Sequence, residues 1–448
     1  MVHVILLSGG SGTRLWPLSN NSRSKQFLKV LRNSNDNPES MVQRTVRKVR
    51  DVLPEANILV ATGKSQVFSI KDQVGGHYHL VVEPERRDTA PAIMLTCAKL
   101  AYDLDANRED SVIVLPIDTY ASNEYYESLV ELVGAVNCSD DLVLLGIEPT
   151  YPSEKYGYIL PSDNQGGVCK VSCFVEKPTE GKACQLIKEG ALWNGGVFGF
   201  KLGYGLDILE SYNSSKDFHK ILNEYCFFPE NSFDYEVVEK ASSISVVPYR
   251  GEWKDLGTWN TLSEEMAEDY SGRIVFDEDT CKNVHAINET SIPLVISGIE
   301  DAVIVATPDG ILASSKECSV KLKPLVEKAA LTRPMYEKRC WGEYRVIDSG
   351  VYGDGQKAIT KELVIGSGKQ LSYQRHCKRS EVWTVIAGKG EIVLDGVISA
   401  LEPGRVIDIQ PGQLHSARAF QDLHIIEVQL GDVLIEEDIE RFGNFWSD

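Results

Sequence analysis

Four short, almost wholly apolar runs near the start of the chain constrain its fold more than any other feature. Each is rich in residues that favour strands, and each has the length of a strand buried on both faces of a sheet. Segments of helical period, such as 41–53 and 90–103, lie between them. This alternation predicts an α/β domain with a doubly wound mixed sheet. The apolar runs are 4–7, 58–61, 112–115 and 142–145.

The rest of the chain has a different pattern of residues. A length of 448 residues suggests two or three domains. Short β runs recur about every ten residues from 272 to 317, which is typical of a small β-solenoid or a β-arm. From 343 onward the chain is nearly all β with glycine turns, as in a sandwich or jelly roll. We therefore expect three units, at 1–269, 270–330 and 331–448.

Charge and composition exclude several classes of protein. The formal net charge of −19 argues against nucleic-acid binding, which needs a basic face. No apolar run approaches the roughly 20 residues that a membrane span requires, and the first residues lack the features of a signal peptide. The ten cysteines are scattered and include no CxxC pair, as expected for reduced thiols. We expect a cytoplasmic protein with no nucleic-acid or membrane partner.

A glycine-rich loop, Gly-Gly-Ser-Gly-Thr-Arg at 9–14, directly follows the first apolar run. Glycines lack Cβ atoms, so several backbone N–H groups of such a loop can converge on an anion. One reaction that such an anion-binding loop can serve is nucleotidyl transfer. This reaction spreads negative charge over the α-phosphate and the leaving diphosphate, and fixed cations stabilise the charge there. Arg14 can hold the leaving oxygens, and Lys25 can hold an attacking sugar phosphate.

A carboxylate ends one of the buried runs. The sequence Leu-Pro-Ile-Asp at 115–118 places Asp118 directly after the third apolar run. Ligands of open α/β sheets bind at the carboxyl ends of the strands. Mg²⁺ is typically held by one or two carboxylates together with substrate phosphates. Asp118 is therefore a candidate magnesium ligand.

The loop and its flanks resemble the signature of a known family. The run 7–19, Leu-Ser-Gly-Gly-Ser-Gly-Thr-Arg-Leu-Trp-Pro-Leu-Ser, and Lys-Gln-Phe-Leu at 25–28 are similar to those of bacterial mannose-1-phosphate guanylyltransferases. Trp16-Pro17 distinguishes this branch from the glucose-1-phosphate enzymes. The resemblance implies a Rossmann-like nucleotidyltransferase domain that converts GTP and mannose 1-phosphate to GDP-mannose and diphosphate, with Mg²⁺. One departure is Ser24, where the family usually has proline.

The same resemblance implies roles for further residues. It pairs Asp118 with Asp255, in Trp-Lys-Asp-Leu-Gly-Thr-Trp at 253–259, as the Mg²⁺ ligands, and makes both catalytic with Arg14 and Lys25. The family usually has asparagine at Asp88, so the base preference stays open, although a carboxylate can accept from guanine N1–H and N2–H₂. The implied nucleotide-binding residues are Leu7, Gly9, Gly10, Ser11, Gly12, Thr13, Glu83, Arg87, Asp88, Thr89 and Ala90. The implied sugar-phosphate-binding residues are Tyr156, Gly157, Glu176, Lys177, Asn194 and Asp234.

A second candidate site lies in the C-terminal β region. Gln374, His376 and Glu381 are closely spaced, and His415 follows a Pro-Gly turn. Positions 374 and 376 of one strand point to the same face. Such a set of nitrogen and oxygen ligands suits a divalent metal such as Zn²⁺, Mn²⁺, Fe²⁺ or Co²⁺.

This pattern resembles a cupin, and in particular the type II phosphomannose isomerase domain that is fused to many of these guanylyltransferases. Two departures alter the surroundings of the metal set. Three consecutive histidines are common in the family where this chain has His-Cys-Lys at 376–378, and a histidine is common at Val382. Isomerisation needs a base and an electrophile that holds the enediolate, so the altered surroundings leave isomerase activity open.

Several functional hypotheses remain from the sequence. The leading one is a mannose-1-phosphate guanylyltransferase. One alternative adds mannose-6-phosphate isomerase activity in the cupin, and another gives the cupin only a metal-binding or structural role, for example in a homodimer. A third alternative is a transferase for another sugar 1-phosphate or another base. A hypothesis of a different class, a non-catalytic nucleotide-sugar sensor, is disfavoured because a pure binder does not need the set Arg14, Lys25, Asp118 and Asp255.

Overall fold

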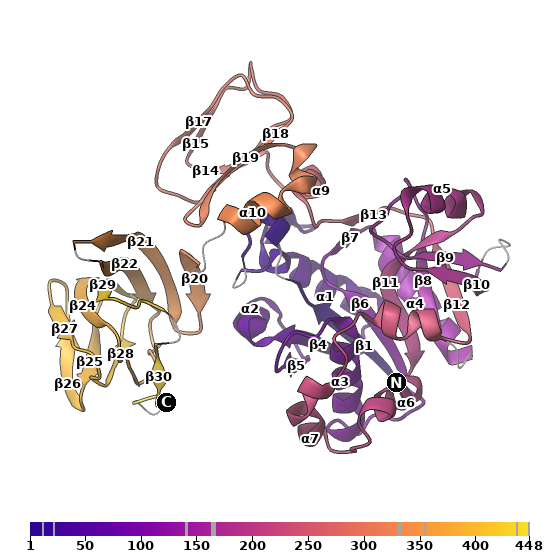
Figure 1. Ribbon diagram of the computed structural model, residues 1–448, viewed down its shortest axis with the longest axis horizontal. Coiled ribbons are helices and arrows are strands. Elements are labelled where there is room, and N and C mark those ends of the chain that lie inside the picture. The colour runs from indigo at the N-terminus through magenta and orange to yellow at the C-terminus, as the bar shows by residue number, and fades with distance from the viewer. Residues whose placement is uncertain are drawn as a thin grey trace.

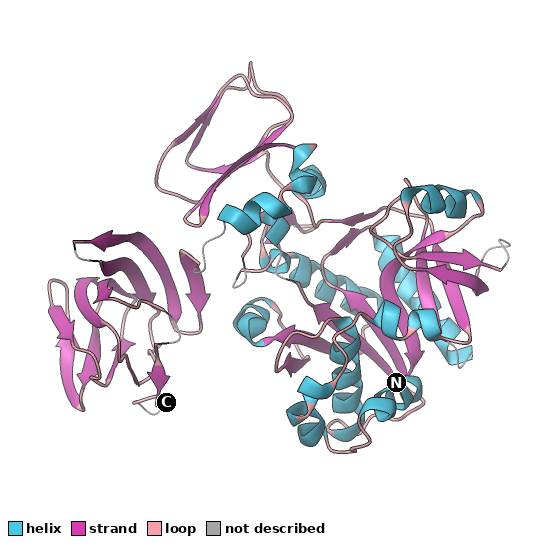
Figure 2. Cartoon of the chain, viewed as in Figure 1, coloured by secondary structure: helices cyan, strands magenta, loops and turns pink. Residues whose placement is uncertain are grey.

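The chain forms three parts, seen in the computed structural model as an N-terminal α/β part, a small middle part and a C-terminal β part (Figure 1). The structure describes residues 1–10, 13–20, 23–138, 142–162, 167–329, 334–353, 355–435 and 438–446. Figure 2 shows that helices concentrate in the N-terminal part, whereas the C-terminal part consists of strands and loops.

A nine-stranded mixed sheet forms the centre of the N-terminal part, in the order β5-β4-β1-β6-β11-β8-β12-β10-β9. Its strands are β1 (Val2–Ser8), β4 (Asn57–Gly63), β5 (His79–Glu83), β6 (Ser111–Pro116), β8 (Leu142–Ile147), β9 (Tyr158–Pro161), β10 (Cys169–Val175), β11 (Leu192–Lys201) and β12 (Ile244–Tyr249). The four apolar runs become β1, β4, β6 and β8, and β1 pairs in parallel with β4 and β6. Strand β11 is antiparallel to both β6 and β8, so the predicted mixed sheet is confirmed.

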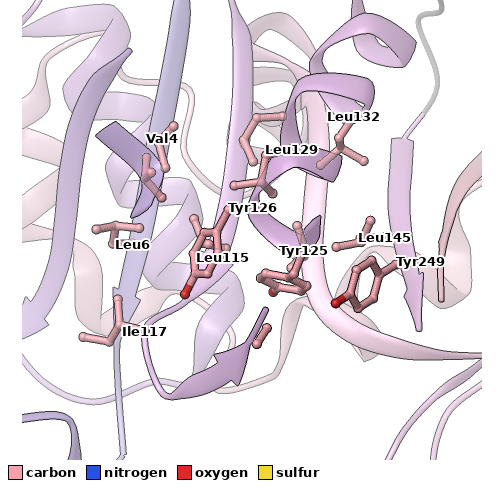
Figure 3. Close-up of a cluster of buried hydrophobic side chains, with 14 of the residues drawn as sticks. Val4, Leu6, Leu115, Ile117, Tyr125, Tyr126, Leu129, Leu132, Leu145 and Tyr249 are labelled. Carbon is pink, nitrogen blue, oxygen red and sulfur yellow. The ribbon is translucent and has the colours of Figure 1, made fainter. Parts of the chain in front are cut away.

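Helices cover both faces of this sheet and bury its apolar side chains. They are α1 (Met41–Val52), α2 (Val67–Gln73), α3 (Thr89–Tyr102), α4 (Asn123–Cys138), α5 (Glu180–Lys188), α6 (Leu202–Tyr212), α7 (Phe218–Asn223) and α8 (Phe233–Glu236). Helix α9 (Trp259–Glu265) packs instead in a separate buried cluster with Leu15 and Val305. Helix α1 begins at a capping box formed by Ser40 and Gln43, which satisfies backbone N–H groups of its first turn. Tyr125 and Leu129 of α4 pack in one cluster with Leu6 of β1 (Figure 3). The loops that follow these strands are therefore anchored to a sheet that is buried on both faces.

The middle part is built mainly from short parallel strand pairs. Strand β16 pairs in parallel with β14 and β18, and β15 pairs in parallel with β17, whereas β19 is antiparallel to β18. The bounds are β14 (Tyr270–Gly272), β15 (Ile274–Phe276), β16 (His285–Asn288), β17 (Leu294–Ile296), β18 (Ala302–Thr307) and β19 (Gly310–Ser315), followed by α10 (Lys323–Ala329). The β runs expected at this spacing are thus present as strands.

This middle part packs directly on the segment that follows the glycine loop. Leu15 and Leu18 lie in one buried cluster with Val305 of β18. In addition, the two terminal nitrogens of Arg23 donate hydrogen bonds to the carboxylate of Glu289, at 2.6 and 2.8 Å. The middle part therefore supports the segment between Arg14 and Lys25, which the sequence pattern did not predict.

The C-terminal part consists of two antiparallel sheets that enclose a core around Trp383. The first has the order β20-β21-β22-β29-β24-β27 and the second β26-β25-β28-β23-β30. The bounds are β20 (Tyr336–Arg339), β21 (Gly342–Tyr352), β22 (Gln356–Ile365), β23 (Gln374–Arg375), β24 (Ser380–Ala387), β25 (Gly390–Leu394), β26 (Val397–Leu401), β27 (Val406–Ile409), β28 (His415–Ala419), β29 (Leu423–Gly431) and β30 (Glu440–Arg441). Strands that are consecutive in the sequence, such as β23 and β24, belong to different sheets. Two facing sheets connected in this way are the architecture expected of a cupin.

The cysteines and the helices also bear on the expectations from composition. All ten cysteines are free thiols. In the portions of the chain that the structure describes, none of the helices combines the length and the apolar character that crossing a bilayer demands.

Candidate active site

The glycine loop lies at the carboxyl end of β1. Strand β1 ends at Ser8 and leads into Gly9 and Gly10, and Gly10 has a φ of +90°, a left-handed conformation that glycine adopts without steric cost. Arg14 lies beyond the loop with its side chain exposed. Leu7 is half-buried in β1. Two predicted loop residues, Ser11 and Gly12, and the side chain of Thr13 lie outside the described residues.

Lys25, Asp118 and Asp255 form one ion-paired cluster. Lys25 opens a short 3₁₀ helix, η2 (Lys25–Phe27), and its Nζ lies 2.8 Å from Asp118 Oδ2 and 3.5 Å from Asp255 Oδ1. Asp118 follows β6, and the next strand, β7 (Thr119–Ala121), pairs with β13 (Trp253–Asp255). In that pairing Asp255 stands opposite Thr119. Two distant segments of the sequence are thereby joined at one point of the sheet edge.

The electrostatics of this cluster keep Lys25 and Asp118 charged. Burial lowers the pKa of Lys25, but the charges of Asp118 and Asp255 outweigh burial and hold that pKa above its ordinary value. Burial likewise opposes ionisation of Asp118, yet the Lys25 ammonium holds the pKa of Asp118 below its ordinary value. The cluster can therefore offer carboxylate oxygens to a divalent cation and an ammonium group to phosphate oxygens.

A cavity of about 230 Å³ adjoins these aspartates. Its walls include Asp118 and Asp255 together with the complete predicted sugar set: Tyr156, Gly157, Glu176, Lys177, Asn194 and Asp234. The sugar residues come from separate segments of the sequence, which extend from the loop before β9 to α8. The structure thus brings the predicted sugar residues and the predicted metal pair into one cavity.

Polar groups inside this cavity are partly unsatisfied. Glu176 Oε1 accepts from Lys177 Nζ at 2.7 Å, whereas its Oε2 is buried and has no hydrogen-bond partner among the described residues. Asn194 Nδ2 donates to Asp234 Oδ1 at 2.5 Å. Burial, reinforced by the charge of Glu176, raises the pKa of Asp234 to about 6. A buried acceptor without a donor suits a ligand that brings hydroxyl groups.

Two features of the cavity were not predicted from the sequence. A Cβ on Gly157 would collide with Glu176 Oε2, so glycine at this position allows the carboxylate to approach the backbone. The rings of Trp193 and Trp253 lie 5.0 and 5.3 Å from that of Tyr156. The signal in the sequence was an aromatic residue close to a predicted site residue: Trp193 directly precedes Asn194, and Trp253 lies two residues before Asp255.

The predicted base-recognition segment lies at the carboxyl end of β5 and the start of α3. Glu83 Oε2 accepts from the Tyr225 hydroxyl at 2.8 Å, and burial raises the pKa of Glu83. Asp88 is exposed, has a φ of 68° and caps α3 by accepting from the Thr89 N–H at 2.8 Å. Ala90, in the first turn of α3, is buried.

Arg87 is already engaged with groups of the protein. Its Nε donates to Glu85 Oε1 at 2.5 Å and its Nη1 donates to the Phe228 carbonyl at 2.8 Å. The guanidinium therefore ties the loop after β5 to the segment before α8. Strands β4 and β1 separate β5 from β6 in the sheet, so a ligand that contacts both this segment and the Lys25 cluster has to span their width.

In the C-terminal part, His376, Glu381 and His415 converge between the two sheets. Their candidate ligand atoms all lie within 4.8 Å of one another, and the three residues are buried. Gln374 Nε2 lies 3.5 Å from His376 Nε2, so the fourth predicted ligand is adjacent. The second ring nitrogens are held by backbone carbonyls: His376 Nδ1 by that of Asp438, at 2.7 Å, and His415 Nδ1 by that of Gln413, at 3.1 Å. Orientation of this kind is typical of metal-binding histidines.

The donor set fits a divalent metal. His415 Nε2 is buried and lacks a hydrogen-bond partner within the described ranges, as expected of a nitrogen reserved for a ligand. Burial, together with the Arg379 charge, lowers the pKa of His376 to about 4, so its imidazole is neutral near pH 7. Arg379 Nε also donates to Glu381 Oε1 at 2.9 Å.

Two further buried polar side chains, Glu427 and Gln429, adjoin these residues and were not predicted as part of the site. Gln429 Nε2 donates to Glu381 Oε1 at 3.3 Å and to Glu427 Oε1 at 3.1 Å. Burial, reinforced by Glu381, raises the pKa of Glu427 to about 7. Glu427 and Gln429 share the buried face of β29 with Leu423 and Ile425, since side chains alternate along a strand, so this buried face changes from apolar to polar along the strand.

Comparison with known proteins agrees with this arrangement. Residues 3–272 match the family described as nucleotidyl transferase, and residues 327–444 match the family described as mannose-6-phosphate isomerase C-terminal. The alginate biosynthesis protein AlgA of Pseudomonas aeruginosa PAO1 is 30% identical, with 99% of this chain and 96% of the relative aligned. The xanthan biosynthesis protein XanB of Xanthomonas campestris pv. campestris (strain ATCC 33913) is 32% identical, with 98% and 97% aligned.

A relative from Salmonella montevideo named mannose-1-phosphate guanylyltransferase is 28% identical, with 99% of each chain aligned. Among solved structures, one described as mannose-1-phosphate geranyltransferase from Thermus thermophilus is similar with a TM-score of 0.60 at 28% identity. That similarity covers 73% of this chain and 98% of the other.

The fold and the cluster at the sheet edge are those of a nucleotidyltransferase. The chain belongs to the nucleotidyl transferase family. It carries in addition the isomerase-like C-terminal domain, and its similarity to AlgA and XanB extends over their nearly complete lengths.

Proposed function

We propose that this protein transfers the guanylyl group of GTP to α-D-mannose 1-phosphate and releases diphosphate. The observation that carries the proposal is the single cavity that joins Asp118 and Asp255 to the six candidate sugar residues. The name of the full-length relative from Salmonella montevideo, mannose-1-phosphate guanylyltransferase, supports the choice of nucleotide and sugar. The sugar phosphate would meet the nucleotide beside Asp118 and Asp255, which line the cavity and pair with Lys25.

In this reaction a phosphate oxygen of mannose 1-phosphate attacks the α-phosphorus of GTP in line, and the bond to the bridging oxygen of the diphosphate breaks. Lys25 would hold the attacking phosphate beside the α-phosphorus, and exposed Arg14 would hold oxygens of the leaving diphosphate. Backbone N–H groups of the loop that begins at Gly9 would bind the remaining phosphate oxygens. Catalysis then consists of positioning and charge stabilisation, with no covalent enzyme intermediate.

Asp118 and Asp255 are suited to hold a Mg²⁺ ion. Their carboxylates approach a common point, since both lie within 3.5 Å of Lys25 Nζ. When bound there, the ion supplies positive charge that neutralises phosphate oxygens. In the chain itself the Lys25 ammonium pairs with both carboxyl groups.

In the sugar cavity, Glu176, Asn194 and Asp234 would bind hydroxyl groups, and Lys177 would neutralise the sugar phosphate. Tyr156 and Gly157 would form the wall against which the ring packs. For the base, Glu83 and Asp88 would accept from guanine N–H groups, with Arg87 holding the loop and Thr89 and Ala90 presenting the start of α3. These roles follow the family resemblance and the places of the residues in the fold.

The pKa of Asp234 gives a pH-dependent prediction. Below about pH 6 this carboxyl gains a proton and loses its capacity as a charged acceptor, so the KM for mannose 1-phosphate should rise as the pH falls from about 8 to about 5. The phosphate of the sugar also titrates near pH 6, with its second pKa at about 6. Asp234→Asn provides the control, because it keeps the phosphate titration and removes that of the carboxyl. Identical KM profiles for the two proteins would rule out a role for Asp234 ionisation.

A panel of substrates separates the proposed activity from its alternatives. GTP, ATP, CTP and UTP are each combined with mannose 1-phosphate, glucose 1-phosphate and other sugar 1-phosphates, and diphosphate release is followed. GTP with mannose 1-phosphate should give the highest kcat/KM. A higher kcat/KM for another combination of nucleotide and sugar phosphate would reassign the substrate. The base is the less certain of the two, because the family usually has asparagine at Asp88.

A second activity, interconversion of fructose 6-phosphate and mannose 6-phosphate, is favoured by the buried His376, Glu381 and His415 cluster together with the isomerase-like domain. We propose that Gln374 and these three residues hold a divalent metal, which supplies the electrophile that aldose–ketose isomerisation needs. Three further expectations from the sequence remain proposals. They are domain boundaries at 270 and 331, a β-solenoid in the middle part, and a homodimer.

The isomerase proposal has a direct test. Full-length protein with fructose 6-phosphate and Zn²⁺, Mn²⁺, Fe²⁺ or Co²⁺ should form mannose 6-phosphate, and His415→Ala should reduce the rate at least about 100-fold, since loss of one metal ligand disrupts the site. Guanylyl transfer by the same variant should be unchanged. If none of the four metals supports product formation, the cupin has a metal-binding or structural role only.

A further inference from the structure

Beneath the glycine loop lies a cluster of buried polar side chains that the proposed mechanism does not use. Its members are Ser8 at the end of β1, Thr62 on β4, Gln66 at the end of η3 (Lys64–Gln66), and Ser24 and Gln26 on either side of Lys25. Each is at most 2% exposed. We call these five residues the loop-floor cluster. A buried polar cluster at the base of a phosphate loop needs a physical reason, because polar groups are costly to bury.

Gln66 is the centre of the loop-floor cluster. Its Oε1 accepts from Ser8 Oγ at 2.9 Å and from Thr62 Oγ1 at 3.0 Å. Its Nε2 donates to Ser24 Oγ at 2.8 Å. One amide therefore joins two neighbouring parallel strands of the sheet to the residue that precedes Lys25.

The loop-floor cluster also reaches the glycine loop itself. Gln66 Nε2 lies 3.5 Å from the Gly10 carbonyl oxygen, and Gln26 Nε2 lies 3.5 Å from that of Gly9 and 3.3 Å from Ser8 Oγ. The two side-chain amides thus flank the backbone that would bind phosphate and the short helix that carries Lys25. Both functional segments rest on the same buried hydrogen bonds.

Ser24 stands where the resembling family usually has proline. Its φ of −73° is a value that a proline ring also imposes. The side chain is fully buried, and its hydroxyl accepts from Gln66. The backbone before Lys25 therefore has a conformation that can be fixed in two ways, by a ring or by a buried hydrogen bond.

We propose that Gln66 is a positioning residue for the transferase reaction, and that its hydrogen bond to Ser24 fixes Lys25 relative to the glycine loop. The inference deepens the proposed function and rests on it. Neither residue touches substrate in this proposal. Instead, the two residues fix the positions of Lys25 Nζ and of the backbone carbonyl and N–H groups of the loop during the reaction.

Three variants test the link as a double-mutant cycle: Ser24→Ala, Gln66→Leu and the double variant. Gln66→Leu removes the central amide at nearly constant size and should lower kcat about 10- to 100-fold, since small misplacements of reacting groups can cost that much. The KM values for GTP and mannose 1-phosphate should change less than about threefold. The double variant should lose little more than Gln66→Leu alone, because coupled residues are not additive.

Ser24→Pro in the Gln66→Leu background supplies a rescue. The ring should recover at least about tenfold of the lost kcat, because it holds φ without needing a hydrogen-bond donor. A merely structural contribution would change stability and would not be rescued in kcat. Ser111→Ala is the matched control: Ser111 is also 2% exposed and its Oγ donates to Asn137 Oδ1 at 2.8 Å, but it begins β6 at the opposite end of the sheet.

The outcomes are distinct. An unchanged kcat in Gln66→Leu, or losses that simply add in the double variant, overturns the positioning role. If the unsubstituted protein transfers no nucleotide, the proposed function fails separately, and the cycle is then measured in the free energy of unfolding from urea melts. In that case additive losses overturn the Ser24–Gln66 link, and non-additive losses retain it.

Discussion

Replacing Lys25 with alanine should lower the rate of guanylyl transfer about 10²- to 10³-fold, the range found when one preorganised donor to a developing charge is removed. Lys25 Nζ is held 2.8 Å from Asp118 and 3.5 Å from Asp255, so the ammonium has a fixed position before substrates bind. Both kcat and kcat/KM should fall together, because the interaction strengthens as charge develops. Diphosphate release measured at saturating GTP and mannose 1-phosphate gives kcat directly.

The Lys25→Ala protein also leaves two carboxylates facing each other without their cation, so its thermal midpoint must be measured alongside its rate. Lys29→Ala is the matched control, because Lys29 lies four residues further along and its side chain is exposed. It should keep both the rate and the midpoint. A Lys25→Ala rate within about threefold of the original, in a folded protein, would contradict the catalytic role of Lys25.

Asp255→Asn should produce the other large effect, at least about a 100-fold loss of transfer at low Mg²⁺. The substitution removes one of two carboxylates that we propose as Mg²⁺ ligands, so half-saturation should move to a higher Mg²⁺ concentration. Some rate should return as Mg²⁺ is raised, which a misfolded variant would not show. The measurement is diphosphate release as a function of Mg²⁺ at fixed substrates.

Glu264→Gln is the control for this substitution. Glu264 lies on the neighbouring helix α9, where its carboxylate accepts from Lys254 Nζ at 3.2 Å and belongs to a surface ion-pair group. This variant should keep the original Mg²⁺ curve. An Asp255→Asn protein whose Mg²⁺ dependence matches that of Glu264→Gln would show that Asp255 does not hold the ion.

The strands of the central sheet were predictable because they are buried on both faces and therefore almost wholly apolar. Residues 4–7 and 112–115 become β1 and β6 for this reason. The place of strand β11 in the sheet was not predictable, although the family resemblance implies a role for Asn194 within it. The strand includes Trp-Asn-Gly-Gly at 193–196 and enters the sheet between β6 and β8, and strand order is a tertiary property that no local pattern encodes.

The candidate site shows the same division. Asp118 could be proposed from its place after an apolar run, since the carboxyl end of a strand is a local feature. Its proximity to Asp255 depends on β7 and β13, each only three residues long, which leave almost no pattern in a sequence. The resemblance to a family supplied the pairing, and the register of these two strands gives its physical basis.

The contacts by which the middle part supports the site were almost completely unpredictable from the sequence. The ion pair between Arg23 and Glu289 and the hydrogen bond from Asn20 to Asp309, at 2.6 Å, connect the segment before Lys25 to the middle part. Charged and amide side chains of this kind look like ordinary surface residues in a sequence. Only the three-dimensional arrangement reveals that the middle part supports the segment between Arg14 and Lys25.

The most direct test of the proposed activity uses the full-length protein with GTP, mannose 1-phosphate and Mg²⁺, and follows GDP-mannose and diphosphate together. We expect the two products to appear in equal amounts, with no product when Mg²⁺ is removed by a chelator. Tight binding of GDP-mannose without any release of diphosphate under the same conditions would contradict the transferase assignment and would indicate a nucleotide-sugar sensor.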